Sequence, residues 1–250
     1  MIGGGRRRWR ATVARGTGTL LDLFFPRACA GCGRPDPAAG RFLCWDCLAR
    51  VEFIQPPFCE LCGDPVAGRI GHAYRCALCA HRRVYFDGAR SAARYEGPVG
   101  QMIRDLKYHG HLWLADDLAD LLAASVRTHY DGVVFDAVVA VPLHWVKERA
   151  RGFNQSAWLA AALARRLRLP PPRRCIRRAR ADPSQTHLTA EARADNVRGA
   201  FRTRWHRWMD GRRFLLVDDV MTTGATANEC ARALKAGGAA SVYVVTVARG

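Results

Sequence analysis

The sequence predicts an α/β fold, in which a parallel sheet is flanked by helices and preceded by a small cysteine-rich module. Three apolar runs, FDAVVAV, FLLV and SVYVVTVA, alternate with two segments of helical periodicity, the order of a sheet with right-handed crossovers. The first two runs lack polar alternation, as expected for strands that are buried on both faces. Eight of the ten cysteines lie between residues 29 and 79, ahead of these elements.

Local signals place the strands and helices. Pro142 closes the first strand, and a helix follows over residues 155–167, where Ala and Leu recur at helical spacing. RRFLLVDDV predicts the second strand, and GATANECARALKAGG predicts a helix that ends at Gly237–Gly238. SVYVVTVAR, residues 241–249, predicts the third strand.

The segment before the first of these strands predicts a hairpin and two helices. VYFDGARSAARYEGPVG has the alternation and the glycines that are typical of a β-hairpin. PVGQMIRDLKYHG and HLWLADDLADLLAASVRTHY carry apolar residues at helical spacing. We interpret Asp116, Asp117 and Asp120 in the second helix as a solvated face rather than a catalytic cluster.

The N-terminal cysteines form four Cys-x-x-Cys pairs: CAGC, CWDC, CELC and CALC. Glycine follows the first and the third pair, which is typical of a tight turn that directs two thiolates to one ion. Four thiolates make the closed tetrahedral site of structural zinc, so the pattern predicts two zinc ions. The predicted ligands are Cys29, Cys32, Cys44, Cys47, Cys59, Cys62, Cys76 and Cys79.

Other interpretations of the cysteines fit less well. A disulfide scaffold does not suit a chain without an export signal, and a redox Cys-x-x-Cys is expected singly. Sequential pairing of the ligand pairs is favoured over interleaved pairing, although spacing does not decide between them. His72 and His81 are alternative ligands that four cysteines per site make unnecessary. Cys175 and Cys230 stand apart and are expected to be small buried apolar residues.

These patterns divide the chain into three parts. Residues 1–19 are expected to form a disordered basic arm, residues 20–84 a double zinc ribbon and residues 85–250 the α/β domain. GTLLDLFFPRAC predicts a short helix, and packing against the zinc module or the next domain is favoured over a membrane surface. No apolar run reaches the roughly 18 residues of a membrane span, and no signal peptide is recognisable, so we expect a cytoplasmic protein.

The net charge points to anionic partners. The chain has a formal net charge of +17, and 36 of its 39 basic residues are Arg. Eight thiolates and two Zn²⁺ ions together contribute −4, which leaves +13. Such an excess favours nucleic acid or phosphorylated ligands.

The turn between the second strand and its helix predicts a phosphate site. Ligands of parallel sheets bind beyond the carboxyl ends of the strands, where both this turn and residues 142–152 begin. Backbone amides at a helix start attract phosphate, and small hydroxyl side chains with a glycine allow close approach. The turn supplies these residues as Thr222, Thr223, Gly224 and Thr226, and it lacks the Lys of a Walker A loop.

Two carboxylates precede this turn. Asp218 and Asp219 would repel a bare phosphate, but carboxylates accept hydrogen bonds from a vicinal diol and bind hard cations. Helix capping alone would need one such residue and would not require the pair together with the threonines and the glycine. A phosphosugar satisfies both halves of the motif.

FLLVDDVMTTGAT resembles the signature of type I phosphoribosyltransferases that binds phosphoribosyl pyrophosphate (PRPP), over 13 residues. VPLHWVKERARGFNQS and QTHLTAEARADNVRGAF, behind an N-terminal Cys-x-x-Cys module, are similar to the ComF family of competence-associated proteins. The resemblance covers residues 20–249. It implies a type I phosphoribosyltransferase-like sheet in residues 85–250 and a link to DNA uptake and natural transformation.

The resemblance also implies roles for single residues. Asp218 and Asp219 would be the catalytic pair that holds the ribose 2′ and 3′ hydroxyl groups. The 5′-phosphate would be wrapped by Thr222, Thr223, Gly224, Ala225 and Thr226. Cations near the pyrophosphate would be Lys147, Arg149 and Arg151. Pyrophosphate would leave C1′ through an oxocarbenium-like state, with Mg²⁺ neutralising the leaving charge.

Two further segments are matched to the family. Residues 177–201 would be a mobile loop over the ligand, with Arg180, Gln185 and Arg193 as its functional members. Residues 85–130, together with the zinc module, correspond to the hood that selects the acceptor in type I enzymes, but this region contains no motif that identifies an acceptor. Lys107 and Tyr108 match a family segment without a physical role that the sequence reveals.

Two hypotheses follow. In the first, the chain is a phosphoribosyltransferase that binds PRPP and Mg²⁺. In the second, it is a non-catalytic competence factor that binds single-stranded DNA, works with other competence proteins and uses PRPP as a regulatory or structural ligand. The second rests on the net charge, the zinc ribbons and the resemblance to the competence family. The eight arginines of residues 165–180 could contact phosphates, and Trp205 and Trp208 could stack on bases, with a solvated loop and core tryptophans as the alternative.

Overall fold

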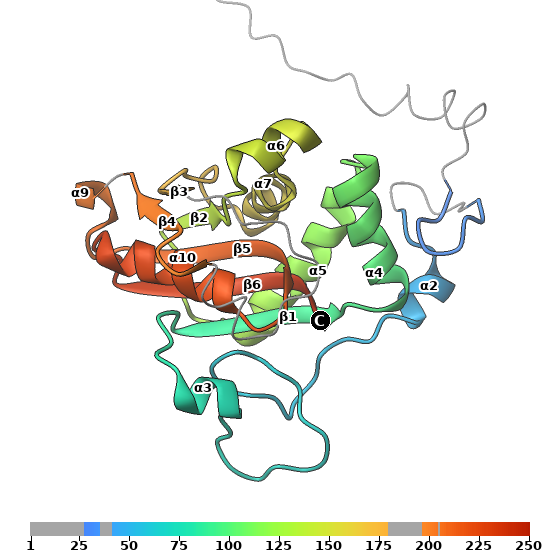
Figure 1. The fold of residues 1–250 in the computed structure, drawn as a ribbon. Coiled ribbons are helices and arrows are strands. Elements are labelled where there is room, and N and C mark those ends of the chain that lie inside the picture. The colour runs from blue at the N-terminus through green and yellow to red at the C-terminus, as the bar shows by residue number, and fades with distance from the viewer. Residues whose placement is uncertain (1–27, 36–41, 180–196, 205) are drawn as a thin grey trace, which may run out of the picture.

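The fold of the chain was analysed in a computed structural model, which describes residues 28–35, 42–179, 197–204 and 206–250 (Figure 1). Its centre is a four-stranded sheet in the order β1-β6-β5-β2, and all three strand pairs are parallel. The strands are β1 Gly88–Arg94, β2 Ala137–Ala140, β5 Arg213–Met221 and β6 Ser241–Arg249. The predicted class, a parallel sheet flanked by helices, is confirmed.

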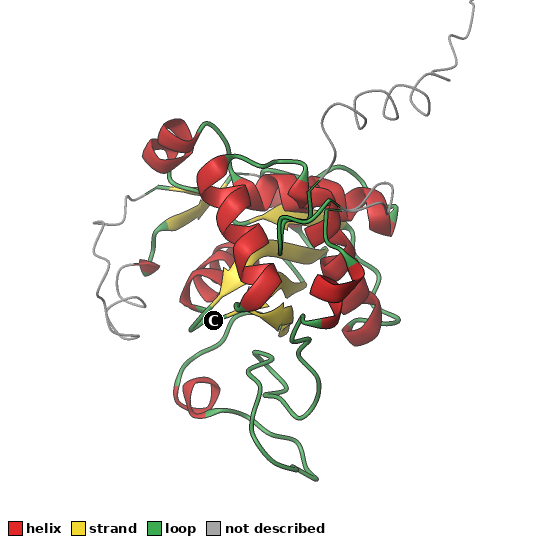
Figure 2. Ribbon diagram, turned by 90° about the vertical axis from the view of Figure 1, so that its right-hand side faces the viewer, coloured by secondary structure: helices red, strands yellow, loops and turns green. Residues whose placement is uncertain are grey.

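Helices cover both faces of the sheet (Figure 2). On one face α5, Leu114–His129, and α7, Gln155–Leu167, pack side by side, with α4, Gly97–Arg104, beyond α5. On the other face lies α10, Ala225–Ala236. Beside α10 lie the short strands β3, Ile176–Arg178, and β4, Phe201–Thr203, which pair with each other, and helix α9, His206–Met209.

Strand β5 shows why two layers of helix are needed. Leu215 and Val217 point into the core under α5 and α7, whereas Phe214 and Leu216 point into the core under α10. All four side chains are fully buried. Burial of each such side chain contributes about 1.5–3 kcal/mol, so a polar substitution on either face of this strand would be costly.

Helices α5 and α7 are joined by ion pairs as well as by apolar contacts. Arg166 of α7 pairs with Asp116 and Asp120 of α5, and Arg165 also reaches Asp116 at 3.0 Å. Asp117 accepts a hydrogen bond of 2.6 Å from the amide of Phe42 in the cysteine-rich module. The three acidic residues therefore hold neighbouring elements in place.

Two sequence predictions about secondary structure were wrong. The expected hairpin at residues 84–100 is the single strand β1, which pairs with β6 from the far end of the chain. The arginine-rich sequence of residues 170–201 suggests an irregular segment, but it contains β3 and leads into β4. In both cases the partner strand is distant in sequence, so local alternation could not reveal the pairing.

The cysteine-rich module lies along the outer edge of β1. Its short helices are α2, Trp45–Ala49, and α3, Ala77–His81. The amide of Ala89 donates to Leu61 O at 2.8 Å, and the amide of Ile54 donates to Ala92 O at 3.1 Å. Residues 51–63 thus use hydrogen-bonding groups that β1, an edge strand of the sheet, leaves open.

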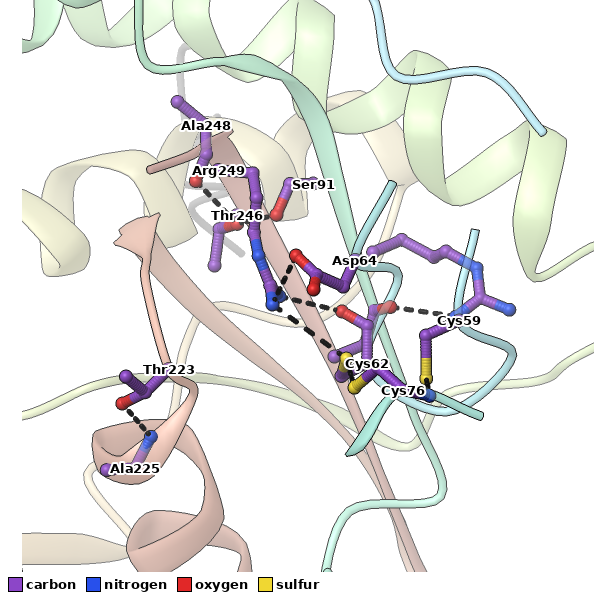
Figure 3. A network of polar contacts seen from close by, with 12 residues as sticks. Cys59, Cys62, Asp64, Cys76, Ser91, Thr223, Ala225, Thr246, Ala248 and Arg249 are labelled. Atoms are coloured by element: carbon purple, nitrogen blue, oxygen red, sulfur yellow. Dashed lines mark hydrogen bonds and ion pairs between the residues drawn. The ribbon is translucent and has the colours of Figure 1, made fainter. Parts of the chain in front are cut away.

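Arg249 at the end of β6 fastens the second half of this module (Figure 3). Its guanidinium donates to Cys62 O at 2.9 Å and pairs with Asp64 at 2.9 Å, and the residue is 6% exposed. Charge-assisted bonds of this kind contribute about 1.5–3 kcal/mol when they are shielded from water. Arg249 therefore fixes the second half of the module directly to the sheet.

No helix in the described part of the chain is long and apolar enough to cross a bilayer. The basic arm at residues 1–19 and the apolar segment GTLLDLFFP lie outside the described residues.

Candidate functional site

The two aspartates of the candidate site lie within β5. The sequence predicted a strand over RRFLLVDDV, residues 212–220, and the observed strand runs from Arg213 to Met221, so that Val220 and Met221 beyond the pair still bond to β6. Asp218 is half-buried and Asp219 is 4% exposed. Because neighbouring strand residues face opposite sides of a sheet, the two carboxylates have different surroundings.

The turn after β5 has the form expected of an anion site. Gly224 is the N-cap of α10 with φ 72°, and an added Cβ would lie 2.6 Å from Met221 Cε. The hydroxyl of Thr223 accepts a bond of 3.4 Å from the amide of Ala225 (Figure 3). The first turn of α10 carries no acidic residue, and its N-cap provides no side-chain acceptor. The positive end of the helix is thus left for a ligand.

Asp218 is held from helix α7. Ser156 Oγ donates to Asp218 Oδ1 at 2.7 Å, and the amide of Asp219 donates to the same oxygen at 3.0 Å. No hydrogen bond from a described residue reaches Asp218 Oδ2, so this oxygen is available to accept from a ligand hydroxyl. Ser156 was not predicted, although its place in the first turn of a helix after a sheet strand is a usable signal.

Asp219 is held from the hood. Lys107 Nζ lies 2.6 Å from Asp219 Oδ2, and the two side chains are only 16% and 5% exposed. Lys107 belongs to a five-residue π-helix, η1 Asp105–His109, which follows α4 directly. π-Helical turns are rare and occur mostly at functional sites. The structure thus gives Lys107 the physical role that the sequence did not reveal.

The surroundings shift the pKa values of these groups. Burial and the charge of Asp219 raise the pKa of Asp218 to about 7, although Ser156 and Lys107 act in the opposite direction. Burial acts against the charged form of Lys107, but the charge of Asp219 outweighs it and raises the pKa of Lys107. At neutral pH the site therefore contains a charged Lys107–Asp219 pair beside a carboxyl group that is close to its titration point.

The segment after β2 is more regular than predicted. Residues 142–152 were expected to be a loop, but they contain helix α6, Trp145–Arg151. Lys147 and Arg149 are exposed on it. Arg151 donates to Gln155 Oε1 at 2.6 Å and lies over the ring of Tyr108 at 5.6 Å. Arg151 therefore connects this segment to the hood.

The predicted mobile-loop residues Arg180, Gln185 and Arg193 lie outside the described residues, and so does Trp205. Trp208 was considered as a stacking platform. It packs against Phe214 at 5.9 Å between ring centroids, and the guanidinium groups of Arg173 and Arg212 lie over it. The core interpretation of Trp208 is therefore the correct one.

A second concave region lies at the β2 edge of the sheet. It is a cavity of about 450 Å³ between α6, α7 and β3, with Trp145 and Glu148 in its lining. Five arginines belong to its lining, Arg173, Arg174, Arg177, Arg178 and Arg204. By contrast, Arg165 and Arg166 of the same arginine-rich segment are engaged in ion pairs with α5.

The cysteines form two four-thiolate clusters with the predicted sequential pairing. Cys29, Cys32, Cys44 and Cys47 make one cluster and Cys59, Cys62, Cys76 and Cys79 the other, and within each the sulfur atoms lie within 4.8 Å of one another. Sulfur–sulfur distances of 3.8 Å and 3.6 Å match the roughly 3.8 Å of thiolates tetrahedrally bound to Zn²⁺. His72 and His81 belong to neither cluster.

The two clusters repeat one local structure. In each, a glycine after the first Cys-x-x-Cys pair, Gly33 or Gly63, has positive φ and donates to the carbonyl of the first cysteine. In each, the third cysteine is the N-cap of a short helix, and its amide donates to the first sulfur. Amide donors of this kind stabilise thiolates, so the backbone as well as the side chains fits zinc.

Cys175 and Cys230 are fully buried and belong to neither cluster. Burial raises the pKa of Cys175 to about 11, and burial also raises the pKa of Cys230 well above its ordinary value. Both are therefore inert apolar residues, as predicted.

Two segments of the chain match known protein families. Residues 20–81 match the double zinc ribbon domain, and residues 154–250 match the phosphoribosyl transferase domain. Fold and sequence together define a phosphoribosyltransferase-like protein that carries a double zinc ribbon. DNA utilization protein YhgH of Escherichia coli K12 is 31% identical over 231 residues, which are 91% of this chain and 99% of that protein. The chain belongs to the ComF family of competence-associated proteins.

Two other relatives carry related names. Competence protein F of Haemophilus influenzae is 29% identical over 231 residues, which are 90% of this chain and 98% of the relative. Competence protein ComFC of Bacillus subtilis is 28% identical over 214 residues, 83% of this chain and 84% of the relative.

We expect the purified chain to bind two zinc ions, one per four-thiolate cluster. Cys62→Ser should lower the zinc content to about one per chain and lower the melting temperature, because the metal supplies much of the folding free energy of such small modules. Cys230→Ser, at a buried cysteine outside both clusters, is the matched control and should retain two. Elemental analysis with thermal unfolding checks this. A wild-type zinc content in Cys62→Ser would contradict the assignment.

The raised pKa of Asp218 predicts a pH dependence of stability. Between its ordinary value of 3.8 and about 7, the folded state binds a proton more tightly than the unfolded state does. The free energy of unfolding should therefore fall as pH rises through this range, and Asp218→Asn should remove that component. Urea unfolding from pH 5.5 to 8 measures the difference, with Asp131→Asn, at an exposed aspartate that follows α5, as the control. Parallel pH profiles for wild type and Asp218→Asn would contradict it.

Proposed function

We propose that the chain binds PRPP or a related phosphosugar with Mg²⁺ at the carboxyl end of β5, and transfers the phosphoribosyl group. One observation carries the proposal: a carboxylate pair and the open positive end of a helix lie five residues apart on one strand–turn–helix unit. Carboxylates suit the hydroxyl groups of a ribose ring, and helix amides suit its 5′-phosphate.

The two aspartates would divide the work. Asp218 has an oxygen without a described partner and would accept a hydrogen bond from a ribose hydroxyl. Asp219 forms an ion pair with Lys107, which would reduce the repulsion between its carboxylate and the phosphates. The phosphate would be held by the amides of the turn and by the hydroxyl groups of Thr222, Thr223 and Thr226, of which Thr222 is exposed.

Mg²⁺ would neutralise the leaving pyrophosphate, and carboxylate oxygens and phosphate oxygens are the ligands that this ion prefers. The cations of α6, Lys147 and Arg149, are exposed at the end of β2 and would approach the same group. The hood, residues 85–130, would exclude water and select the acceptor. The ion pair between Lys107 and Asp219 connects the π-helix of the hood to β5.

We expect calorimetry to detect binding of PRPP in the presence of Mg²⁺. Asp218→Asn with Asp219→Asn should weaken it by tenfold or more, because each bond to a charged group contributes about 1.5–3 kcal/mol. Asp120→Asn, at an exposed aspartate of α5, is the control and should bind like the wild type. Absence of binding to the wild type, or unchanged affinity in the double variant, would contradict the proposal.

Turnover needs a separate measurement. Release of pyrophosphate from PRPP with candidate nitrogenous acceptors should be detectable with the wild type and lost in the double variant. Binding of PRPP with no release of pyrophosphate under any acceptor would instead favour the regulatory use of the ligand.

A second function is favoured by the arginine-lined cavity at the β2 edge. We infer that it contacts phosphates of single-stranded DNA, since five arginines and a single glutamate belong to its lining, and Trp145, 64% exposed, belongs to it as well. Basic grooves with aromatic side chains are typical of single-strand binding. The names of the relatives, which refer to competence and DNA utilization, support a role in the handling of DNA.

Arg174→Gln with Arg177→Gln should weaken the binding of an oligonucleotide. The slope of log affinity against log salt concentration should also become shallower, by about one unit for each phosphate that is no longer neutralised. Arg94→Gln on β1, at the opposite edge of the sheet, is the control. Fluorescence anisotropy across a salt series checks this. Affinity that does not change between low and moderate salt would contradict DNA binding through phosphates.

A further inference from the structure

One arginine of the zinc module, Arg82, lies beside the turn that follows β5. Arg82 is the C-cap of α3, three residues after the zinc-site residue Cys79. Asn228 of α10 fixes the backbone that follows, because its side chain donates to Arg83 O at 3.0 Å and accepts from the amide of Tyr85 at 2.7 Å. The exit of the module is thereby attached to the first turns of α10.

The guanidinium of Arg82 lies beside Gly224. A Cβ added at Gly224 would be 3.3 Å from Arg82 Nη2. Arg82 Nε and Nη2 are both shielded from solvent, and neither has a hydrogen-bond partner among the described residues. No ion pair between Arg82 and a described carboxylate is formed either, in contrast to Arg232 on the same helix α10, which pairs with Glu229.

This placement is unfavourable without a ligand. Two nitrogen atoms of the guanidinium, Nε and Nη2, are shielded from water without a described hydrogen-bond partner, which costs part of the hydration of its charge. Gly224 is also the N-cap of α10, so this charge lies at the positive end of a helix, where cations are disfavoured. One anion at the turn would satisfy the guanidinium and the helix amides together, and a phosphate offers enough oxygen atoms for both.

We propose that Arg82 is a phosphate-binding residue supplied by the zinc module to the turn at residues 221–226. The inference rests on the proposed function and deepens it, since it assigns the 5′-phosphate a ligand from outside the phosphoribosyltransferase-like domain. Zinc bound by the second cluster keeps α3 folded and therefore positions Arg82. The affinity for phosphosugar thus depends on a metal site that takes no part in the chemistry.

The test compares Arg82→Gln with Arg83→Gln in the full zinc-loaded chain. Arg83 is the adjacent residue, and its guanidinium lies over the ring of Tyr85 at 5.1 Å and does not reach the turn through any described contact. Calorimetry with ribose 5-phosphate should show a loss of tenfold or more for Arg82→Gln and no change for Arg83→Gln. Pyrophosphate, which lacks the sugar phosphate, should bind both variants equally.

Stability provides a readout that separates binding from structure. Because Arg82 is an uncompensated charge in the free protein, Arg82→Gln should leave the melting temperature without ligand unchanged or raise it. It should also reduce the increase in melting temperature that ribose 5-phosphate gives the wild type. Zinc content measured on the same samples should stay at the wild-type value.

The possible outcomes separate the role of Arg82 from the binding of PRPP. Equal affinity of Arg82→Gln and Arg83→Gln for ribose 5-phosphate overturns this inference alone and leaves PRPP binding standing. A lower melting temperature with loss of zinc in Arg82→Gln assigns the residue a structural role and also overturns it. Failure of the wild type to bind either of the two ligands, PRPP and ribose 5-phosphate, overturns both this inference and the proposed function, whereas failure to bind ribose 5-phosphate alone overturns only this inference.

Discussion

The ion pair between Lys107 and Asp219 is the interaction on which the candidate site depends. Strand β5 is buried by helices on both faces, yet it carries two adjacent carboxylates inside its hydrogen-bonded length. An unpaired carboxylate in such a place would be protonated or would destabilise the strand. Lys107 compensates Asp219, and a neutral hydroxyl, that of Ser156, serves Asp218. The hood and helix α7 are thereby fixed relative to the strand that carries the motif.

The sequence predicted the elements whose signals are local. The parallel sheet, helix 155–167 and the two thiolate clusters followed from apolar periodicity and from Cys-x-x-Cys spacing, and the structure confirms them. The hairpin at 84–100 was wrong because alternation shows that a strand is half-buried but not which strand it pairs with. Lys107 and Ser156 could not be assigned because each of them has its partner aspartate more than 60 residues away in the chain. Asp218 and Asp219 were recognised as a pair, but their unequal surroundings depend on that tertiary packing.

The zinc module is part of the domain's packing rather than a separate unit. Cys29 and Cys47 of the first cluster belong to the core under α5, whereas the second cluster belongs to the core under α10. The segment between the clusters crosses the edge of β1. Gly63 shows how close this approach is, because an added Cβ would lie 2.6 Å from Ala89 O. Metal binding and sheet packing thus stabilise each other.

Residues 51–63 cover the open edge of β1 and protect it from pairing with other chains. An uncovered edge strand presents free amides and carbonyls that another chain can pair with, and proteins avoid this by covering or charging their edges. Here the cover is a segment whose own fold is stabilised by zinc. Zinc deprivation would therefore uncover a template for intermolecular strand pairing. For this protein, metal supply would set resistance to aggregation as well as stability.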